Sequence, residues 1–123
     1  MSAPDPLPKY IYKILPSDPS PLTFLPLSDL DEGDGFIHLS TSSQVPSTAD
    51  RFFVSATELW LLKIPYDKVE NRIKWEGNSK AVFPHIYDDD LSKALGEEET
   101  ESVIKCERKE GEQWSGALAK VFD

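Results

Sequence analysis

Both histidines of the chain lie in short apolar segments, His38 in DGFIHLST (34–41) and His85 in AVFPHIYD (81–88). Histidine is the side chain that most readily gains or loses a proton near neutral pH, which suits it to acid–base catalysis. A protein that needs only a polar surface has no reason to place both of its imidazoles in strand-like segments. We therefore expect His38 and His85 to converge on one pocket and to act there as proton donor or acceptor.

Strand alternation predicts what surrounds His38. Successive side chains of a strand point to opposite faces, so Ile37 and Leu39 would enter the core. Phe36, His38 and Ser40 would share the other face. There the strand opens into a helix whose first N–H groups can bind a phosphate. Ser40 and Thr41 would donate hydrogen bonds there.

The same alternation places Phe83, His85 and Tyr87 on one face of the second segment. An imidazole between two aromatic rings suits the binding of a planar ligand. A structural role remains the alternative for both histidines, because buried polar groups generally have hydrogen-bond partners of their own.

Trp75 and Glu76 in KWEG (74–77) precede the second histidine segment. A glutamate beside a bulky aromatic residue can be desolvated enough for acid or base work, although most glutamates are solvated. A metal site would combine both histidines with Glu76 or Asp34. No closely spaced pair of ligands supports such a site.

The elements that must position these residues follow from apolar runs, prolines and glycines. The sequence predicts strands at 10–15, 35–40, 59–65, 73–76, 81–87 and 102–108, and helices at 44–55 and 88–95. The continuous apolar run at 59–65 is typical of a central strand that is buried on both faces. The hydroxyl residues of STSS (40–43) can cap the helix at 44–55, in which Pro46 suits the first turn and Phe52 lies on the apolar face. A long irregular connection rich in proline is expected at 16–35, and a short helix or closing strand at 113–122. This order predicts a single α+β domain over residues 10–123, preceded by a flexible arm at 1–9.

Composition narrows the class of partner. The chain has 123 residues and a formal net charge of -9, from 22 acidic and 13 basic residues. Such a charge repels duplex nucleic acid and anionic membranes, so a small-molecule ligand is expected instead. A single cysteine, Cys106, cannot form an intramolecular disulfide, and no long apolar stretch predicts a membrane span. These features predict a cytoplasmic protein.

Five segments in order resemble a family of small domains without an assigned function: YKIL (12–15), DGFIHLST, LWLLKIP (59–65), KWEG and FPHIY (83–87). The resemblance covers most of residues 10–95. It implies an ADP-ribosyltransferase-like fold, a split and strongly curved antiparallel sheet around a cleft that holds NAD in active relatives. In such transferases an early-strand histidine contacts a ribose hydroxyl, with a serine or threonine nearby. His38, Ser40 and Thr41 are similar.

Two further features of that fold bear on the site. Active transferases carry a catalytic glutamate on a late strand, and Glu76 is the nearest candidate, although KWEG lacks their two-residue motif. The RNA 2′-phosphotransferase branch pairs histidines with arginines to handle NAD and a phosphate. His38 and His85 with Arg51 or Arg72 are similar to that set.

The leading interpretation is a cleft that binds a nucleotide-like or other planar anionic small molecule. Its expected lining is Lys13, His38, Ser40, Thr41, Trp75, Glu76, His85 and Tyr87. Lys13 would offset phosphate charge, Trp75 and Tyr87 would stack on a ring, and His38, Glu76 or His85 would move the proton. NAD-dependent glycosyl or ADP-ribosyl transfer is the enzymatic form of this hypothesis. The alternative is a non-catalytic protein- or ligand-binding module.

Overall fold

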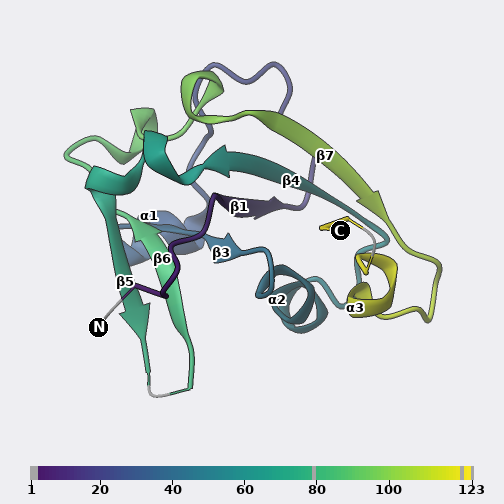
Figure 1. Cartoon of the computed structure of the whole chain (residues 1–123). Coiled ribbons are helices and arrows are strands. Elements are labelled where there is room, and N and C mark those ends of the chain that lie inside the picture. The colour runs from purple at the N-terminus through teal and green to yellow at the C-terminus, as the bar shows by residue number, and fades with distance from the viewer. Residues whose placement is uncertain (1–2, 79, 120, 123) are drawn as a thin grey trace.

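The computed structural model describes residues 3–78, 80–119 and 121–122 (Figure 1). Strands of two antiparallel sheets alternate with short helices, so the α+β class expected from the sequence is confirmed. Within the described residues, no helix combines the length and the apolar character needed to cross a bilayer. Residues 3–9 form neither helix nor strand.

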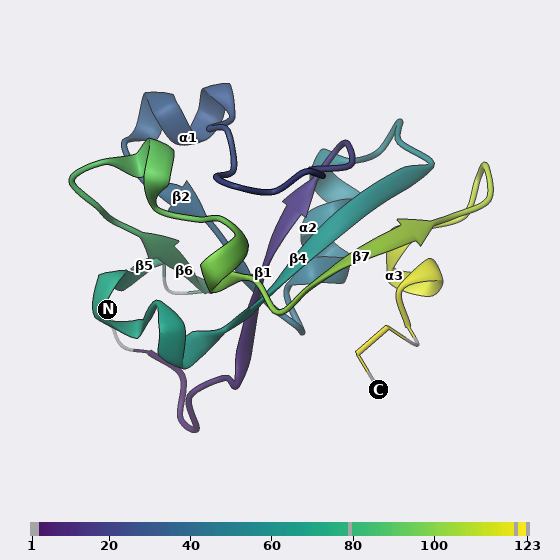
Figure 2. The same ribbon diagram turned by 90° about the horizontal axis from the view of Figure 1, so that it is seen from above.

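In the described part of the chain, seven strands form the two sheets. The four-stranded sheet has the order β3-β1-β4-β7, with β1 at Tyr10–Leu15, β3 at Ser40–Thr41, β4 at Glu58–Pro65 and β7 at Ser102–Glu107. The three-stranded sheet has the order β2-β6-β5, with β2 at Ile37–His38, β5 at Ile73–Gly77 and β6 at Val82–Ile86. Figure 2 shows the two sheets beside each other, with α1 (Asp29–Asp34) next to β2.

The chain crosses from one sheet to the other at Leu39. The preceding strand β2 pairs with β6, whereas the following strand β3 pairs with β1. Leu39 is buried at the crossing, and its N–H donates a 3.1 Å hydrogen bond to the carbonyl of Pro84. One continuous strand at 35–40 was therefore the wrong prediction, because both sheets draw on this short segment.

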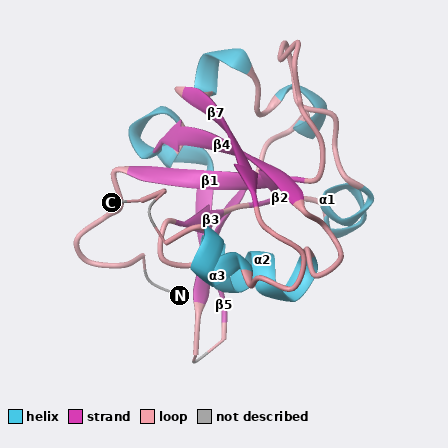
Figure 3. Cartoon of the chain, turned by 90° about the vertical axis from the view of Figure 1, so that its right-hand side faces the viewer, coloured by secondary structure: helices cyan, strands magenta, loops and turns pink. Residues whose placement is uncertain are grey.

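The strand β4 of the four-stranded sheet is buried on both faces, as the continuous apolar run at 59–65 predicted. On one face, Leu62 and Ile64 join the core shared with the three-stranded sheet. On the other face, Leu59 and Leu61 pack in a second core with residues of α2 (Val45–Phe52) and α3 (Trp114–Ala117). Figure 3 shows both of these helices on the same side of the sheet.

The α2 helix confirms the helix expected after the STSS segment, with proline in its first turn. Val45 and Ala49 of this helix are fully buried. Phe52, expected on the same apolar face, is instead 67% exposed. The helix ends there, and Phe53, in its C-cap position, packs against the core in its place.

Two other helices differ from expectation. The 16–35 connection ends in α1, which Ser28 caps by accepting a 3.1 Å hydrogen bond from the N–H of Asp31. Gly35 closes α1 with φ 80, a left-handed conformation that favours glycine.

The helix expected at 88–95 was a wrong prediction, since only a 3₁₀ turn forms there, at Leu91–Lys93. The helix cannot continue because Gly96 forms a β-bridge with Phe24. Further 3₁₀ turns lie at Tyr66–Lys68, Glu70–Arg72 and Glu97–Glu99.

Candidate functional site

The three-stranded sheet brings the two histidines together. His38 on β2 lies directly opposite His85 on β6 in the antiparallel register. Their ring centroids are 5.1 Å apart, with 62° between the ring planes. Both imidazoles are partly accessible, with 31% and 12% of their side chains exposed. Two groups that are far apart in the sequence can therefore contact the same ligand.

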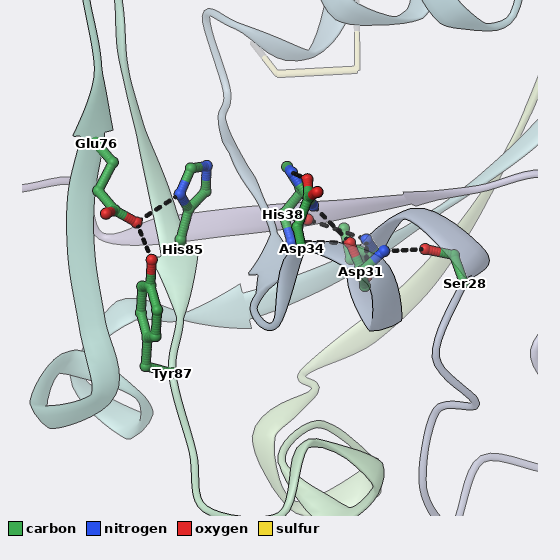
Figure 4. A network of polar contacts seen from close by, with 8 residues as sticks. Ser28, Asp31, Asp34, His38, Glu76, His85 and Tyr87 are labelled. Carbon is green, nitrogen blue, oxygen red and sulfur yellow. Dashed lines mark hydrogen bonds and ion pairs between the residues drawn. The ribbon is translucent and has the colours of Figure 1, made fainter.

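His38 is held between two carboxylates of α1. Its Nδ1 lies 2.6 Å from Oδ1 of Asp31, and its Nε2 lies 3.1 Å from Oδ2 of Asp34 (Figure 4). The backbone N–H of His38 also donates to Oδ1 of Asp31, at 3.2 Å. Both ring contacts are hydrogen bonds only when each ring nitrogen carries a proton. The two carboxylates therefore hold the imidazole ring of His38 in one orientation.

Asp31 is the buried centre of this arrangement. Its side chain is 2% exposed, and its Oδ2 lies 2.6 Å from the Nζ of Lys13. The same ammonium donates a 3.1 Å hydrogen bond to the carbonyl of His38. Burial by itself would raise the pKa of Asp31, but the charge of Lys13 and the hydrogen bonds from Lys13 and His38 hold that pKa below its ordinary value. Asp31 is therefore a carboxylate that orients the imidazole of His38.

His85 belongs to a second carboxylate network. Its Nδ1 lies 2.9 Å from Oε1 of Glu76, and the hydroxyl of Tyr87 donates a 2.6 Å hydrogen bond to the same oxygen (Figure 4). These hydrogen bonds lower the pKa of Glu76, and the bond to Glu76 raises the pKa of Tyr87 to about 12. At neutral pH Glu76 is consequently a carboxylate and Tyr87 a phenol. The Nε2 of His85 contacts no polar partner within the described part of the chain.

Phe36 packs against all three rings of the site and was not singled out from the sequence. Its ring stacks on His85 at a centroid distance of 4.3 Å, and it lies 4.6 Å from His38 and 5.2 Å from Tyr87. Alternation had already placed Phe36 and His38 on the same face, which was the available signal. Phe36 therefore holds the two imidazoles in place by packing against both rings.

Asp31 was the other residue that the sequence did not identify, and Asp34 was considered only as a metal ligand. Both lie in α1, within the connection expected to be irregular. The signal that could have found them is the capping pattern of Ser28, Asp31 and Gly35, which marks a short helix just before the histidine strand.

The structure places several other expected site residues elsewhere. Trp75 is 8% exposed in the core, where its Nε1–H donates to the hydroxyl of Tyr66 at 3.1 Å. Its indole is therefore not on the surface that carries the histidines. Ser40 is buried on β3, and the Thr41 hydroxyl lies 3.2 Å from that of Ser43. The crossing at Leu39 moves Ser40 and Thr41 into the other sheet, so they do not continue the face of His38.

The arginines and the cysteine are also occupied elsewhere. Arg72 binds Asp88 at 3.0 Å and the carbonyl of Ala94 at 2.8 Å. The guanidinium of Arg51 lies over the ring of Phe52 at 5.2 Å. Burial raises the pKa of the Cys106 thiol to about 11, as expected of an inert core cysteine. Over residues 3–78, 80–119 and 121–122, no group of three or more His, Cys, Asp or Glu side chains is arranged to hold a metal ion.

The sequence and the fold of the chain are similar to those of known proteins. The chain is similar to the protein CC0527 from Caulobacter crescentus. The comparison with its crystal structure gives a sequence identity of 29% and a TM-score of 0.67, and it covers 81% of this chain and 88% of that chain. The solution NMR structure of CC0527 is 26% identical over 92% and 98% of the two chains, also with a TM-score of 0.67. No curated protein matches. Residues 22–105, which include both histidines, match the family described as "Protein of unknown function (DUF952)", and the chain belongs to that family.

Proposed function

We propose that the surface around His38 and His85 binds a nucleotide-like or other planar anionic small molecule. We further propose that the two imidazoles move protons during NAD-dependent glycosyl or ADP-ribosyl transfer. The observation that carries the proposal is the pair of imidazoles 5.1 Å apart, each with a carboxylate on its Nδ1. A carboxylate in that position orients the ring and stabilises the charge that forms when the ring accepts a proton.

The two imidazoles have different surroundings, which supports different roles. His38 has a carboxylate on each ring nitrogen, so it would donate a proton from Nε2 as the general acid. His85 has a described polar partner only on Nδ1, so its Nε2 would accept a proton as the general base. Glu76 would act by positioning His85, since its pKa is lowered and it is already shared with Tyr87.

The polar groups fit the sugar of a nucleotide better than its pyrophosphate. The Nε2 of His85 can accept a hydrogen bond from a ribose hydroxyl, and the rings of Phe36 and Tyr87 can pack on a planar group. Lys13 is neutralised by Asp31 and cannot offset phosphate charge, contrary to the role expected from the sequence. Lys74, whose Nζ lies 4.4 Å from the centroid of the Tyr87 ring, is the nearer cation. NAD, when bound, would supply an activated glycosidic bond.

The ADP-ribosyltransferase-like fold is part of this proposal. The chain passes from one antiparallel sheet to the other at Leu39, and this arrangement supports the split sheet that the sequence resemblance implied. The histidine on β2 and the carboxylate on β5 lie on opposite sides of β6 in the smaller sheet, which is compatible with a site built across it.

A ligand screen tests the proposal directly. Thermal unfolding of the whole chain is measured with NAD, ADP-ribose, AMP and nicotinamide. A ligand at 100 times its dissociation constant should stabilise the protein by about 2.7 kcal/mol. The stabilisation should disappear in His85→Asn, which keeps a polar side chain, and persist in the surface control Lys105→Ala. No response to any of the four ligands would refute the proposed binding.

A non-catalytic protein- or ligand-binding module is the second candidate, and one observation favours it. Two depressions of the surface, of about 340 and 360 Å³, lie near Lys9 and Tyr10, and neither is lined by His38 or His85. Under this candidate the histidines would only hold α1 against the sheet. His38→Ala and His85→Ala would then both reduce stability, and neither would change the affinity for any ligand in the screen.

A further inference from the structure

The depression of about 340 Å³ lies where β1 begins, beside the end of β4 and the C-terminal segment. The side chains that matter to its chemistry are those of Lys9, Tyr10, Tyr12, Ser42, Lys63 and Phe122. Its volume falls within the range of about 300–1,000 Å³ that is usual for small-molecule sites. It combines aromatic rings with two lysines on a chain whose net charge is -9.

This depression and the histidine pair lie on opposite faces of β1. Alternation along the strand sends Lys13 to Asp31 and the histidine network, with Ile11 in the core beneath it. Tyr10 and Tyr12 point the other way and pack with the core under α2 and α3. A ligand in the depression would therefore contact none of the residues proposed to move protons.

The depression is lined by the aromatic rings of Tyr12 and Phe122, and Tyr12 also carries a polar hydroxyl. Tyr12 is 6% exposed, and its ring meets that of Phe122 edge to face, with centroids 5.0 Å apart. No described residue forms a hydrogen bond with the Tyr12 hydroxyl. Its oxygen nevertheless keeps some accessible surface, because every fully buried polar side-chain atom of the described residues has a hydrogen-bond partner. The remaining accessible surface of Tyr12 therefore meets the depression, where the hydroxyl can bind a ligand.

Two ammonium groups lie close to the ring of Tyr10. The Nζ of Lys63 lies 4.1 Å and that of Lys9 5.5 Å from its centroid. Lys63 has Glu101 at 3.4 Å, whereas Lys9 has no carboxylate within ion-pair distance in the described part of the chain. Glu101 also accepts a 3.1 Å hydrogen bond from the Tyr10 hydroxyl. Among the described residues, two ammonium groups and one carboxylate thus surround this ring, and Lys9 supplies the positive charge that no carboxylate offsets.

The neighbouring depression of about 360 Å³ shares Lys9 and Tyr10 but is lined by Asp67 and Glu70, which would repel an anion. The smaller depression is therefore the one suited to a negatively charged ligand.

We propose that the 340 Å³ depression binds a small aromatic anion, a planar ring that carries one carboxylate or phosphate group. The ring packs against Tyr12 and Phe122, and the anionic group lies between the ammonium groups of Lys9 and Lys63. Charge-assisted hydrogen bonds from a lysine are stronger than those between neutral groups, so the anion adds to the contribution of the ring. Ser42 is exposed at the rim and donates to the same group.

Amide chemical shifts of the labelled full chain test this inference. Benzoate, phenyl phosphate and neutral benzamide are titrated separately to concentrations on the order of 10 mM. We expect saturable shifts at Tyr10, Tyr12 and Lys63 with an anionic ring, and about tenfold weaker binding of benzamide. Comparison of benzoate with phenyl phosphate identifies the preferred anion.

Three results would overturn the inference: no saturable shift, equal binding of benzamide, or shifts centred on His38 and His85. Lys63→Met keeps most of the side-chain stem and removes the charge, so it should weaken the anion about tenfold and leave benzamide unchanged. His85→Asn should alter neither affinity, which separates this site from the histidine surface. Loss of benzamide binding together with benzoate in Lys63→Met would indicate a structural effect and contradict the assigned role of the charge.

Discussion

Asp31→Asn should destabilise the protein more than any other single charge removal near the histidines. The carboxylate is 2% exposed and its partner Lys13 is 9% exposed, at a distance of 2.6 Å. Asparagine keeps the volume and one acceptor oxygen, so the main loss is the countercharge of a buried ammonium. Removal of one partner from a buried ion pair costs about 3–5 kcal/mol, a large part of the stability of a small domain.

Urea unfolding at neutral pH, followed by circular dichroism, measures this loss. A second substitution, Lys13→Met, removes the unpaired ammonium from the Asp31→Asn protein and should restore at least half of the lost free energy. The exposed pair of Lys105 and Glu58 is the matched control, and Glu58→Gln should leave the free energy of unfolding nearly unchanged. A cost below about 1 kcal/mol for Asp31→Asn, the value for an exposed pair, would refute the reasoning.

The same carboxyl predicts a dependence on pH. The pKa of Asp31 is lower in the folded protein than its ordinary value of 3.8. The stability it contributes is therefore present above that value and is lost as the pH falls through the lowered folded-state pKa. The free energy of unfolding of the natural chain should fall across this acidic range more steeply than that of Asp31→Asn. Parallel curves for the two proteins would show that Asp31 is not the linked group.

Three further outcomes follow from contacts elsewhere in the fold. Glu76→Gln should move the pKa of Tyr87 from about 12 back towards 10.0, measured by phenolate absorbance; an unchanged alkaline titration would contradict the hydrogen bond to Glu76. Cys106, with its pKa raised to about 11, contributes stability that is present below 9.0 and lost as the pH rises through about 11, so Cys106→Ala should flatten that alkaline decline. Gly96→Ala should cost about 1–3 kcal/mol in urea unfolding, because a Cβ there meets neighbouring backbone; equal effects of Gly96→Ala and Gly33→Ala, where a Cβ meets nothing, would refute this.

Local pattern was enough to predict several elements. The apolar run at 59–65 predicted a strand buried on both faces, and β4 has leucines in both cores. Pro46 after a run of hydroxyl residues predicted the start of α2. These predictions succeeded because burial and backbone restriction act through residues adjacent in the sequence. The exposure of Phe52 was missed because the end of a helix depends on where the chain must turn next.

The site itself was partly accessible from the sequence. Unusual residue types in apolar segments identified His38 and His85, and alternation placed Tyr87 beside His85. The same alternation failed for Ser40, because the chain changes sheets at Leu39. The capping pattern around Asp31 could have indicated a short helix there, but not the role of its carboxylate, which comes from burial against Lys13 rather than from any spacing to the histidines.

The sequence by itself determined most of the strands, the α+β class and the two imidazoles, because period and residue type are local properties. Only the tertiary structure decided that β2 and β6 pair so that His38 faces His85, and that each ring receives its own carboxylate. It also sent Trp75 into the core and neutralised Lys13. The physical reason is that antiparallel register and the burial of charge depend on contacts between distant segments, which no single stretch of residues specifies.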